Sequence, residues 1–325
     1  MIKPWIQSAR LRTIPLAISG ILLGVAVAKL HGKSDWQVSV LAVITAIFLQ
    51  VLSNYANDYG DFLKGTDKAA GRNDRMLTTG SISEHTMKNA LIVVSITSFL
   101  TGLSMLWISY SHGLINQENI FFFIGLGIAA IAAAITYTVG KRAYGYFGLG
   151  DFFVFVFFGI VPVIGITKLL GCSFGFEVGL AAAGMGFLST AVLNTNNYRD
   201  IDTDRLSNKI TLAVRMGVKW NLFYHRILLI LGFSGVFLSF YHYLNQMFKI
   251  VESNSMLETV MIFGTFTPGA VLLASHYSAL IRIEPGNREL LNQQLKKLSL
   301  SILLTVIIYC IMVWYFTDII KIPQA

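Results

Sequence analysis

Charged residues are scarce in this chain of 325 residues: Asp, Glu, Lys and Arg make up 13% of it, while 54% is hydrophobic. An average soluble domain carries roughly twice that charged fraction, so the composition excludes an ordinary water-soluble protein. Cysteine is also rare. The only two, Cys172 and Cys310, lie in or beside apolar runs, far apart and without the spacing of metal ligands. Both are expected to be packing residues.

Long apolar runs are what the chain has instead. A helix needs about 20 apolar residues to cross a bilayer, and runs of that kind occur nine times. They lie at residues 14–30, 37–57, 88–110, 118–139, 150–171, 177–198, 220–244, 258–282 and 298–318. A transmembrane barrel would show alternating segments of about ten residues instead. The sequence therefore predicts an all-α integral membrane protein with nine transmembrane helices in a single domain, residues 1–325.

Small residues recur within these runs, as in "GILLGVAVA" and "GLGIAAIAAA". In lipid, such residues let helix backbones approach closely. Both segments are expected to lie at helix contacts.

Basic residues fall mainly on one set of loops. The N-terminal arm and the loops near 58–88, 140–143, 199–219 and 282–297, with Arg226, hold 20 of the 25 Lys and Arg residues. The positive-inside rule places these loops and the N-terminus in the cytoplasm, and nine spans then place the C-terminus outside. Because topology alone explains this pattern, the net charge of +8 predicts no nucleic-acid partner. We expect a multi-pass protein of the cell (inner) membrane, with the lipid bilayer as its surroundings.

A polar stretch, "NYANDYGDFLKGTD", directly follows the second apolar run. Its amides and acids stand at i, i+3, i+4 and i+7, which is one face of a helix: Asn54, Asn57, Asp58 and Asp61. Asp67 follows beyond Gly65, where the helix is expected to end.

A second polar stretch, "NTNNYRDIDTDRLSNK", follows the sixth run. Asn196, Asp200 and Asp204 stand at i, i+4 and i+8, whereas Asp202 points to another face. Both stretches share the pattern Asn-x-x-x-Asp after an apolar span on the cytoplasmic side. This indicates an internal duplication in which the second and sixth spans correspond.

Five carboxylates brought together at a membrane interface repel one another unless they are protonated or bind cations. They are Asp58, Asp61, Asp67, Asp200 and Asp204. Ligand sets made only of oxygens favour hard ions such as Mg²⁺, which fills its remaining positions with water and phosphate oxygens. A single cluster could equally be a set of helix caps, but two matching clusters favour a metal-bridged diphosphate.

Basic and aromatic residues near these clusters are candidates for substrate binding. Arg75 and Lys209 each follow an acidic cluster by a short loop and are predicted to contact the diphosphate. The loop "YTVGKRAYGYFGLGD" brings Tyr137, Lys141 and Arg142 to the same side. Lys141 could bind a phosphate as a point charge and Arg142 bidentately; an interfacial anchor is the alternative for both.

The segments "NDYGDFLKGTD", "YTVGKRAYGYFGLGD" and "NNYRDIDTDR" closely resemble the UbiA superfamily of intramembrane aromatic prenyltransferases, with "WIQSARLRTIPLA" before them. The resemblance covers residues 5 to about 217, and the last three spans match only in being apolar. Many members carry Asn-Asp-x-x-Asp-x-x-x-Asp, whereas here the third acid comes later, at Asp67. This longer form resembles the branch that acts on 1,4-dihydroxy-2-naphthoate in menaquinone biosynthesis.

The resemblance implies a nine-helix bundle around a central cavity, which the two acidic motifs close on the cytoplasmic side. It also implies Mg²⁺-dependent transfer of a polyprenyl group from polyprenyl diphosphate to dihydroxynaphthoate, with decarboxylation, to give demethylmenaquinone. Asp58, Asp61, Asp200 and Asp204 would be catalytic, and with Asp67 would bind the metal. The implied substrate-binding residues are Asn54, Asn57, Arg75, Tyr137, Lys141, Arg142, Asn196, Asn197 and Lys209.

Two alternatives remain at this point. A sibling enzyme would use another aromatic acceptor, 4-hydroxybenzoate or homogentisate. A cation-coupled secondary transporter would also have duplicated halves and intramembrane carboxylates, but its binding site would lie near the bilayer midplane and not at the ends of spans.

Overall fold

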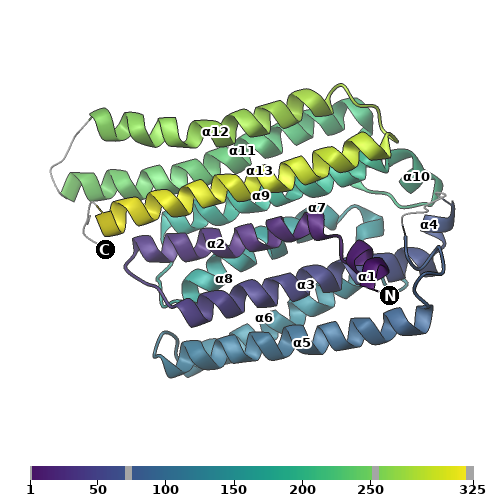
Figure 1. Cartoon of the computed structure of the whole chain (residues 1–325), viewed down its shortest axis with the longest axis horizontal. Helices are drawn as coiled ribbons and strands as arrows, with labels where there is room; N and C mark the ends of the chain where they lie inside the picture. Colours follow the sequence, from purple (N-terminus) through teal and green to yellow (C-terminus); the bar gives the residue numbers. More distant parts are fainter. Residues whose placement is uncertain (1, 70–74, 251–255, 320–325) are drawn as a thin grey trace.

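The computed structural model describes residues 2–69, 75–250 and 256–319. All regular structure in these ranges is helical, and the long helices run side by side along one bundle (Figure 1). Within these ranges, eight helices are long and apolar enough to cross a membrane. They coincide with the first seven predicted spans and the ninth. The prediction of an all-α, multi-pass membrane protein is confirmed.

The helices have the following bounds in chain order. They are α1 Ile2–Ala9, α2 Ile14–Leu30, α3 Trp36–Leu63, α4 Thr66–Ala69, α5 Glu84–Ser111, α6 Gln117–Thr136, α7 Gly150–Phe155, α8 Val161–Leu169, α9 Phe176–Arg199, α10 Ile201–Leu206, α11 Leu212–Ile250, α12 Met256–Leu280 and α13 Arg288–Trp314. A π-helical turn at Val156–Ile160 joins α7 to α8 in one span, and another at Tyr315–Ile319 extends α13.

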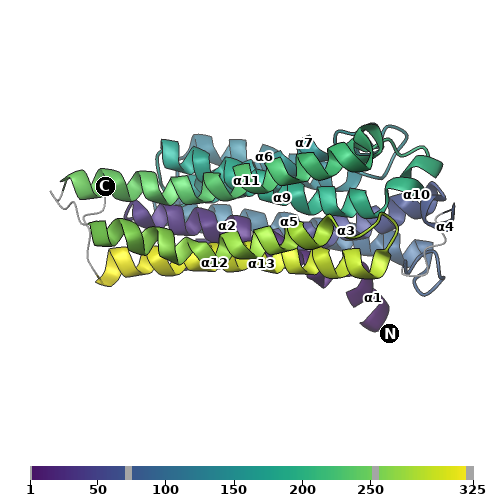
Figure 2. The same ribbon diagram turned by 90° about the horizontal axis from the view of Figure 1, so that it is seen from above.

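The predicted span at residues 258–282 is α12, which is not among the eight. It contains Pro268 and packs against α13, as Figure 2 shows. The count of nine membrane spans therefore stays a prediction.

One end of the bundle carries the short helices α1, α4 and α10, together with the turn between α12 and α13 (Figure 1). The chain begins at this end, and α13 finishes at the opposite one. The positive-inside rule assigns the end with α4 and α10 to the cytoplasm, and that orientation stays a prediction.

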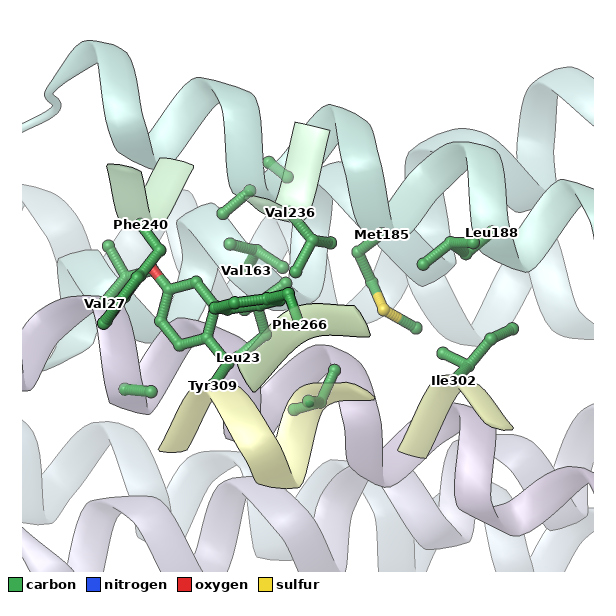
Figure 3. Packing of buried hydrophobic residues seen from close by; sticks show 14 of the residues in the cluster. Leu23, Val27, Val163, Met185, Leu188, Val236, Phe240, Phe266, Ile302 and Tyr309 are labelled. Carbon is green, nitrogen blue, oxygen red and sulfur yellow. The ribbon is translucent and has the colours of Figure 1, made fainter. Parts of the chain in front are cut away.

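The largest apolar core lies among α2, α8, α9, α11, α12 and α13. Figure 3 shows Leu23, Met185, Val236 and Tyr309 meeting there. Helices α9 and α11 approach each other closely at Gly184, because a Cβ there would lie 2.6 Å from the backbone nitrogen of Val236. Small residues thus allow the contact, as is usual between helices in lipid.

The predicted role of the small-residue runs is confirmed for the glycines of one run and not for those of the other, although the second run also lies at contacts with α3 and α5. In "GILLGVAVA", a Cβ on Gly24 would lie 2.8 Å from the backbone oxygen of Val163. In "GLGIAAIAAA", a Cβ on Gly125 or Gly127 would meet nothing within 4 Å. Those glycines lie on α6, which has few buried residues, so composition alone did not identify the contact face.

We therefore expect Gly184→Val to destabilise the protein and Gly125→Val to change its stability little. Forcing extra atoms into a packed contact costs about 1–3 kcal/mol, and valine at residue 184 would meet backbone atoms that cannot rotate away. The melting temperatures of the two purified variants in detergent measure the difference. Equal melting temperatures would contradict the packing described for α9 and α11.

Candidate active site

A cavity of about 320 Å³ opens inside the bundle, between α2, α3, α5, α6, α7, α8 and α9. Polar residues line it at the end where α4 and α10 lie, among them Asp61, Asp67 and Asp204. The rest of its wall is largely apolar and reaches Ala42, near the start of α3, and Leu169 at the end of α8. A ligand that matches this wall has a compact, charged head and a long apolar tail.

The first acidic cluster lies on α3 as the spacing predicted. The helix continues through Asp61 to Leu63, and Gly65 ends it with a φ of 71°. From this cluster Asn54, Asn57 and Asp61 line the cavity, and Asp67 joins them from α4.

Asp58 is buried but lies outside the cavity lining. Its carboxylate accepts hydrogen bonds from Ser8 Oγ and Arg10 Nη2, both at 2.6 Å, and from Arg75. Because α1 packs against α3 at this point, Asp58 ties the N-terminal segment to the site.

The i, i+4, i+8 spacing of the second acidic cluster predicts one continuous helix, and the structure instead interrupts the helix at Asp200. Helix α9 ends at Arg199, and Asp200 has non-helical angles (φ −103°, ψ 12°) before α10 begins. The side chain of Asp200 is drawn into an ion pair with its neighbour Arg199. Even so, Asn196, Asp200 and Asp204 all line the cavity.

The remaining residues of the second cluster lie elsewhere. Asn197 is buried outside the cavity lining, and Asp202 is exposed. The spacing had already placed Asp202 on another face.

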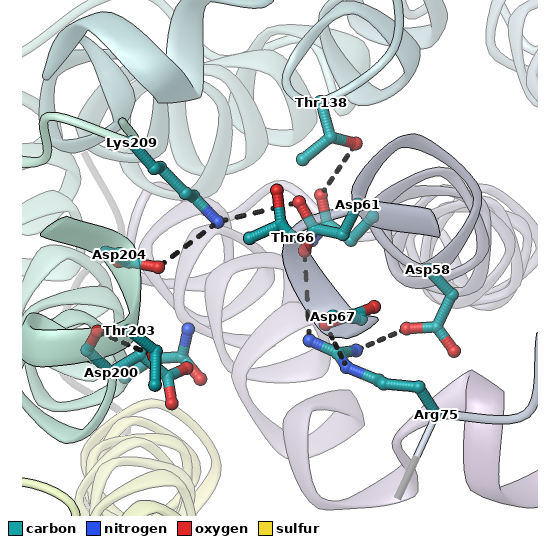
Figure 4. Close-up of polar contacts among 12 residues, drawn as sticks. Asp58, Asp61, Thr66, Asp67, Arg75, Thr138, Asp200, Thr203, Asp204 and Lys209 are labelled. Atoms are coloured by element: carbon teal, nitrogen blue, oxygen red, sulfur yellow. Dashed lines mark hydrogen bonds and ion pairs between the residues drawn. The ribbon is translucent and has the colours of Figure 1, made fainter. Parts of the chain in front are cut away.

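Basic side chains pair with the acidic ones: Lys209 lies between the two clusters, and Arg75 lies within the first (Figure 4). Lys209 Nζ is 3.7 Å from Asp61 Oδ1 and 4.0 Å from Asp204 Oδ1, so it bridges the two halves. Arg75 contacts Asp58, and its Nε lies 3.4 Å from Asp67 Oδ1. The acidic segments, 140 residues apart in the chain, therefore form one centre.

Lys209 is held in its charged form. Burial lowers its pKa, but the carboxylates of Asp61 and Asp204 outweigh that effect and raise the pKa well above the ordinary value of 10.5. Because the pKa of Lys209 is higher in the folded chain than in the unfolded chain, its charge stabilises the fold. This contribution to the free energy of unfolding is complete below the pKa of the unfolded chain and is lost only as pH rises to the pKa of the folded chain.

We therefore expect the melting temperature difference between wild type and Lys209→Met to stay constant from about pH 6 to about pH 9. Lys209 is protonated over this whole range in both the folded and the unfolded chain. Thermal unfolding in detergent at several pH values measures it. A difference that shrinks within this window would show that Lys209 titrates there and would contradict the assigned environment.

Tyr146, which the sequence did not single out, is central to the site. Its hydroxyl donates to Asp61 Oδ1 at 2.8 Å and lies 2.7 Å from Thr66 Oγ1, while Lys64 Nζ lies 3.6 Å from the centre of its ring. The tyrosine-rich loop was the only signal, and it did not distinguish Tyr146 from its neighbours.

The structure does not bring every candidate from this loop to the cavity. Tyr137 lines it, whereas Lys141 and Arg142 are exposed and lie outside the lining. Those two residues match the alternative interpretation, an interfacial anchor.

The donor set fits a hard cation. Asp61, Asp67 and Asp204 are buried carboxylates that line the polar end of the cavity, and their oxygens are the ligand type that Mg²⁺ prefers. Among the described residues, no three acidic, histidine or cysteine side chains are already gathered as a metal cage. Arg75 and Lys209 lie between the carboxylates instead.

Fold and site together define a class of polytopic helical membrane protein, in which two aspartate-rich segments close one end of an apolar cavity. The chain belongs to the UbiA prenyltransferase family, which it matches over residues 17–251.

Curated relatives have a more specific name. The chain is 45% identical over 231 residues to a 1,4-dihydroxy-2-naphthoate octaprenyltransferase of Haemophilus influenzae, covering 70% of this chain and 74% of that protein. It is 44% identical over 232 residues to the protein of the same name from Escherichia coli, covering 70% and 73%.

Solved structures share the fold. A UbiA homolog from Archaeoglobus fulgidus, bound to DMAPP and Mg²⁺, has a TM-score of 0.59 at 15% identity, covering 95% of this chain and 98% of that one. A UbiA homolog from Aeropyrum pernix K1 also has a TM-score of 0.59 at 15% identity, covering 91% and 97%. At this identity the likeness shows the fold alone.

Proposed function

We propose that the protein transfers a polyprenyl group from polyprenyl diphosphate to 1,4-dihydroxy-2-naphthoate, with loss of CO₂, to give demethylmenaquinone after oxidation. One observation carries the proposal: two acidic clusters meet at the polar end of a long apolar cavity. A polyprenyl diphosphate has the same distribution of polarity, with a charged diphosphate at one end and a long apolar chain. The names of the curated relatives support the naphthoate as acceptor.

Asp61, Asp67 and Asp204 would hold Mg²⁺, with Asp58 and Asp200 beside them. When bound, the metal supplies Lewis-acid neutralisation of the leaving diphosphate. Homologues from Archaeoglobus fulgidus solved with Mg²⁺ and DMAPP or GPP support a metal-dependent site.

Arg75 and Lys209 bind the diphosphate oxygens and so orient the prenyl chain along the cavity. The allylic C–O bond then breaks, and its electron pair leaves on the diphosphate. The apolar wall excludes water from the allylic cation. Tyr144, Phe153 and Phe157 line the cavity, and aromatic rings are the side chains suited to stabilise a cation there.

The electron-rich naphthoate ring attacks the allylic cation through the carbon that bears its carboxylate. A C–C bond forms to the prenyl group, the bond to the carboxylate breaks, and its electron pair restores the aromatic ring as CO₂ leaves. This step needs no proton from the enzyme. Arg12, Thr13 and Gln50 line the polar end of the cavity and are suited to hydrogen-bond the carboxylate and hydroxyls of the acceptor.

The site faces the cytoplasm of a cell (inner) membrane in this proposal. The basic loops lie at the same end of the bundle as the acidic clusters, and the positive-inside rule assigns that end to the cytoplasm. A soluble, charged acceptor reaches the cavity from there, while the prenyl donor stays in lipid.

An acceptor competition tests the proposal. Purified protein in detergent receives Mg²⁺ and a labelled polyprenyl diphosphate, with dihydroxynaphthoate, 4-hydroxybenzoate and homogentisate together and EDTA as control. Prenylation of the naphthoate with CO₂ release, abolished by EDTA, is expected. Prenylation of another acceptor would overturn the acceptor assignment. No product with any acceptor would overturn transfer itself and favour a transporter, which needs a gradient that detergent removes.

A further inference from the structure

The turn between α12 and α13 docks on the junction between α9 and α10. Tyr198 Oη donates to the backbone oxygen of Ile283 at 2.9 Å, and the backbone nitrogen of Gly286 donates to the oxygen of Arg199 at 3.2 Å. Leu291 of α13 is fully buried in a small apolar cluster with Tyr198. The last helices, in which the sequence showed no motif, therefore contact the second acidic cluster directly.

Two arginines hold Asp200 at this junction. Arg199 contacts it through both nitrogens of a fork, with Nε 3.0 Å from Oδ1 and Nη2 2.5 Å from Oδ2. Arg288, the first residue of α13, adds a contact of 3.1 Å from Nη1 to Oδ1. Asp200 is only 6% exposed and Arg199 2%, so the ion pair between them is largely shielded from water. The side chain of Arg288 is 31% exposed, so its ion pair with Asp200 is partly shielded.

Arg288 also connects Asp200 to the next helix. Its Nη2 lies 3.5 Å from Thr203 Oγ1, so one guanidinium touches both the end of α9 and the first turn of α10. Helix α10 has only six residues, too few to keep a fixed orientation without tertiary contacts. It carries Asp204, which lines the cavity and faces Lys209.

The first cluster is built in the same way. Asp58 stands four residues after Asn54, as Asp200 stands four residues after Asn196, and Asp58 is also held by two arginines, Arg10 and Arg75. In both halves, an arginine from outside the helix thus holds the aspartate that the Asn-x-x-x-Asp pattern marks.

We propose that Arg288 is a positioning residue of the prenyl-transfer site. It braces the break between α9 and α10, so that Asp200 stays fixed and Asp204 faces the diphosphate. The inference rests on the proposed function and extends it, because it assigns a role in the site to the C-terminal helices.

The test compares Arg288→Gln with Arg282→Gln. Arg282 lies in the same turn but is exposed, so its variant is a matched control. Losing a residue that orients metal ligands typically costs 10–100-fold in affinity. We expect Arg288→Gln to raise the KM for polyprenyl diphosphate and the half-saturating Mg²⁺ concentration by about tenfold, with a smaller change in kcat. Arg282→Gln should stay within about twofold of wild type.

A second readout does not need turnover. Mg²⁺-dependent binding of a non-reactive prenyl thiodiphosphate should weaken by a similar factor in Arg288→Gln. KM, Mg²⁺ dependence and analogue binding that all match those of Arg282→Gln would overturn the proposal, even with a lowered melting temperature. If Arg288→Gln yields no folded protein, Arg288→Lys, which lacks the planar fork, is judged by the same criterion. If the wild-type protein transfers no prenyl group, the proposed function is contradicted. Binding of the analogue to wild type and to Arg288→Gln would still show whether Arg288 positions the site.

Discussion

Asparagine in place of Asp61 or Asp204 is expected to lower kcat/KM by about 10³-fold, since both would lose a charge that acts on the departing diphosphate. Each carboxylate is buried, lines the cavity and lies about 4 Å from the shared Lys209. Asparagine keeps the shape and one oxygen but removes the negative charge that a metal needs. Steady-state kinetics of the purified variants in detergent measure the effect.

Asp202→Asn is the matched control. Asp202 lies on α10 like Asp204, but it is exposed and outside the cavity lining. Its variant should keep kcat/KM within about twofold of wild type. If Asp204→Asn were as active as Asp202→Asn, Asp204 would have no role in catalysis and α10 would not be part of the site.

Lys209→Met is expected to lower kcat/KM by about 10²-fold. Lys209 Nζ lies between the two acidic clusters, at 3.7 Å and 4.0 Å from their carboxylates, where it balances their repulsion and is placed to meet phosphate oxygens. Methionine keeps much of the length of the side chain without its charge. The loss should appear in both KM for the prenyl diphosphate and kcat.

Lys141→Met is the matched control for that variant. Lys141 is an exposed lysine of a loop at the same end of the bundle, outside the cavity lining. Its replacement should leave kcat/KM within about twofold of wild type. Equal losses in the two variants would indicate a general electrostatic effect of this surface, and would contradict a specific role for Lys209.

Periodicity within single segments predicted much of the secondary structure, because helix formation depends mainly on residues close together in the chain. Among the described residues, eight of the nine apolar runs are helices both long and apolar enough to cross a membrane. The face of α3 that carries Asn54, Asn57 and Asp61 is the face predicted. Gly65 ends that helix where its backbone turns to positive φ. These features depend on neighbours within one helix, so a single sequence contains the information.

The predictions from sequence were wrong where contacts between segments far apart in the chain determine the position of a side chain. Asp58 lies outside the cavity lining because α1 brings Ser8 and Arg10 to it. The helix breaks at Asp200, where Arg199 and Arg288 hold its carboxylate. Arg288 comes from 88 positions further along the chain. No spacing rule within one segment predicts such contacts.

The sequence also did not show which polar residues at the membrane surface face the site and which face solvent. Tyr146 bonds Asp61, whereas Lys141 and Arg142 of the same loop face outward. All of them satisfy the composition expected of an interfacial loop. The direction of each side chain depends on how the loop packs against α3 and α4, and that requires the structure.

A structure of the protein with Mg²⁺ and a non-reactive prenyl thiodiphosphate would show directly whether the two acidic clusters hold the diphosphate. We expect diphosphate density between Asp61, Asp67 and Asp204, in contact with Arg75 and Lys209. The prenyl chain should run along the apolar wall towards Leu169. Diphosphate bound elsewhere, for example at the exposed Lys141 and Arg142, would contradict the account.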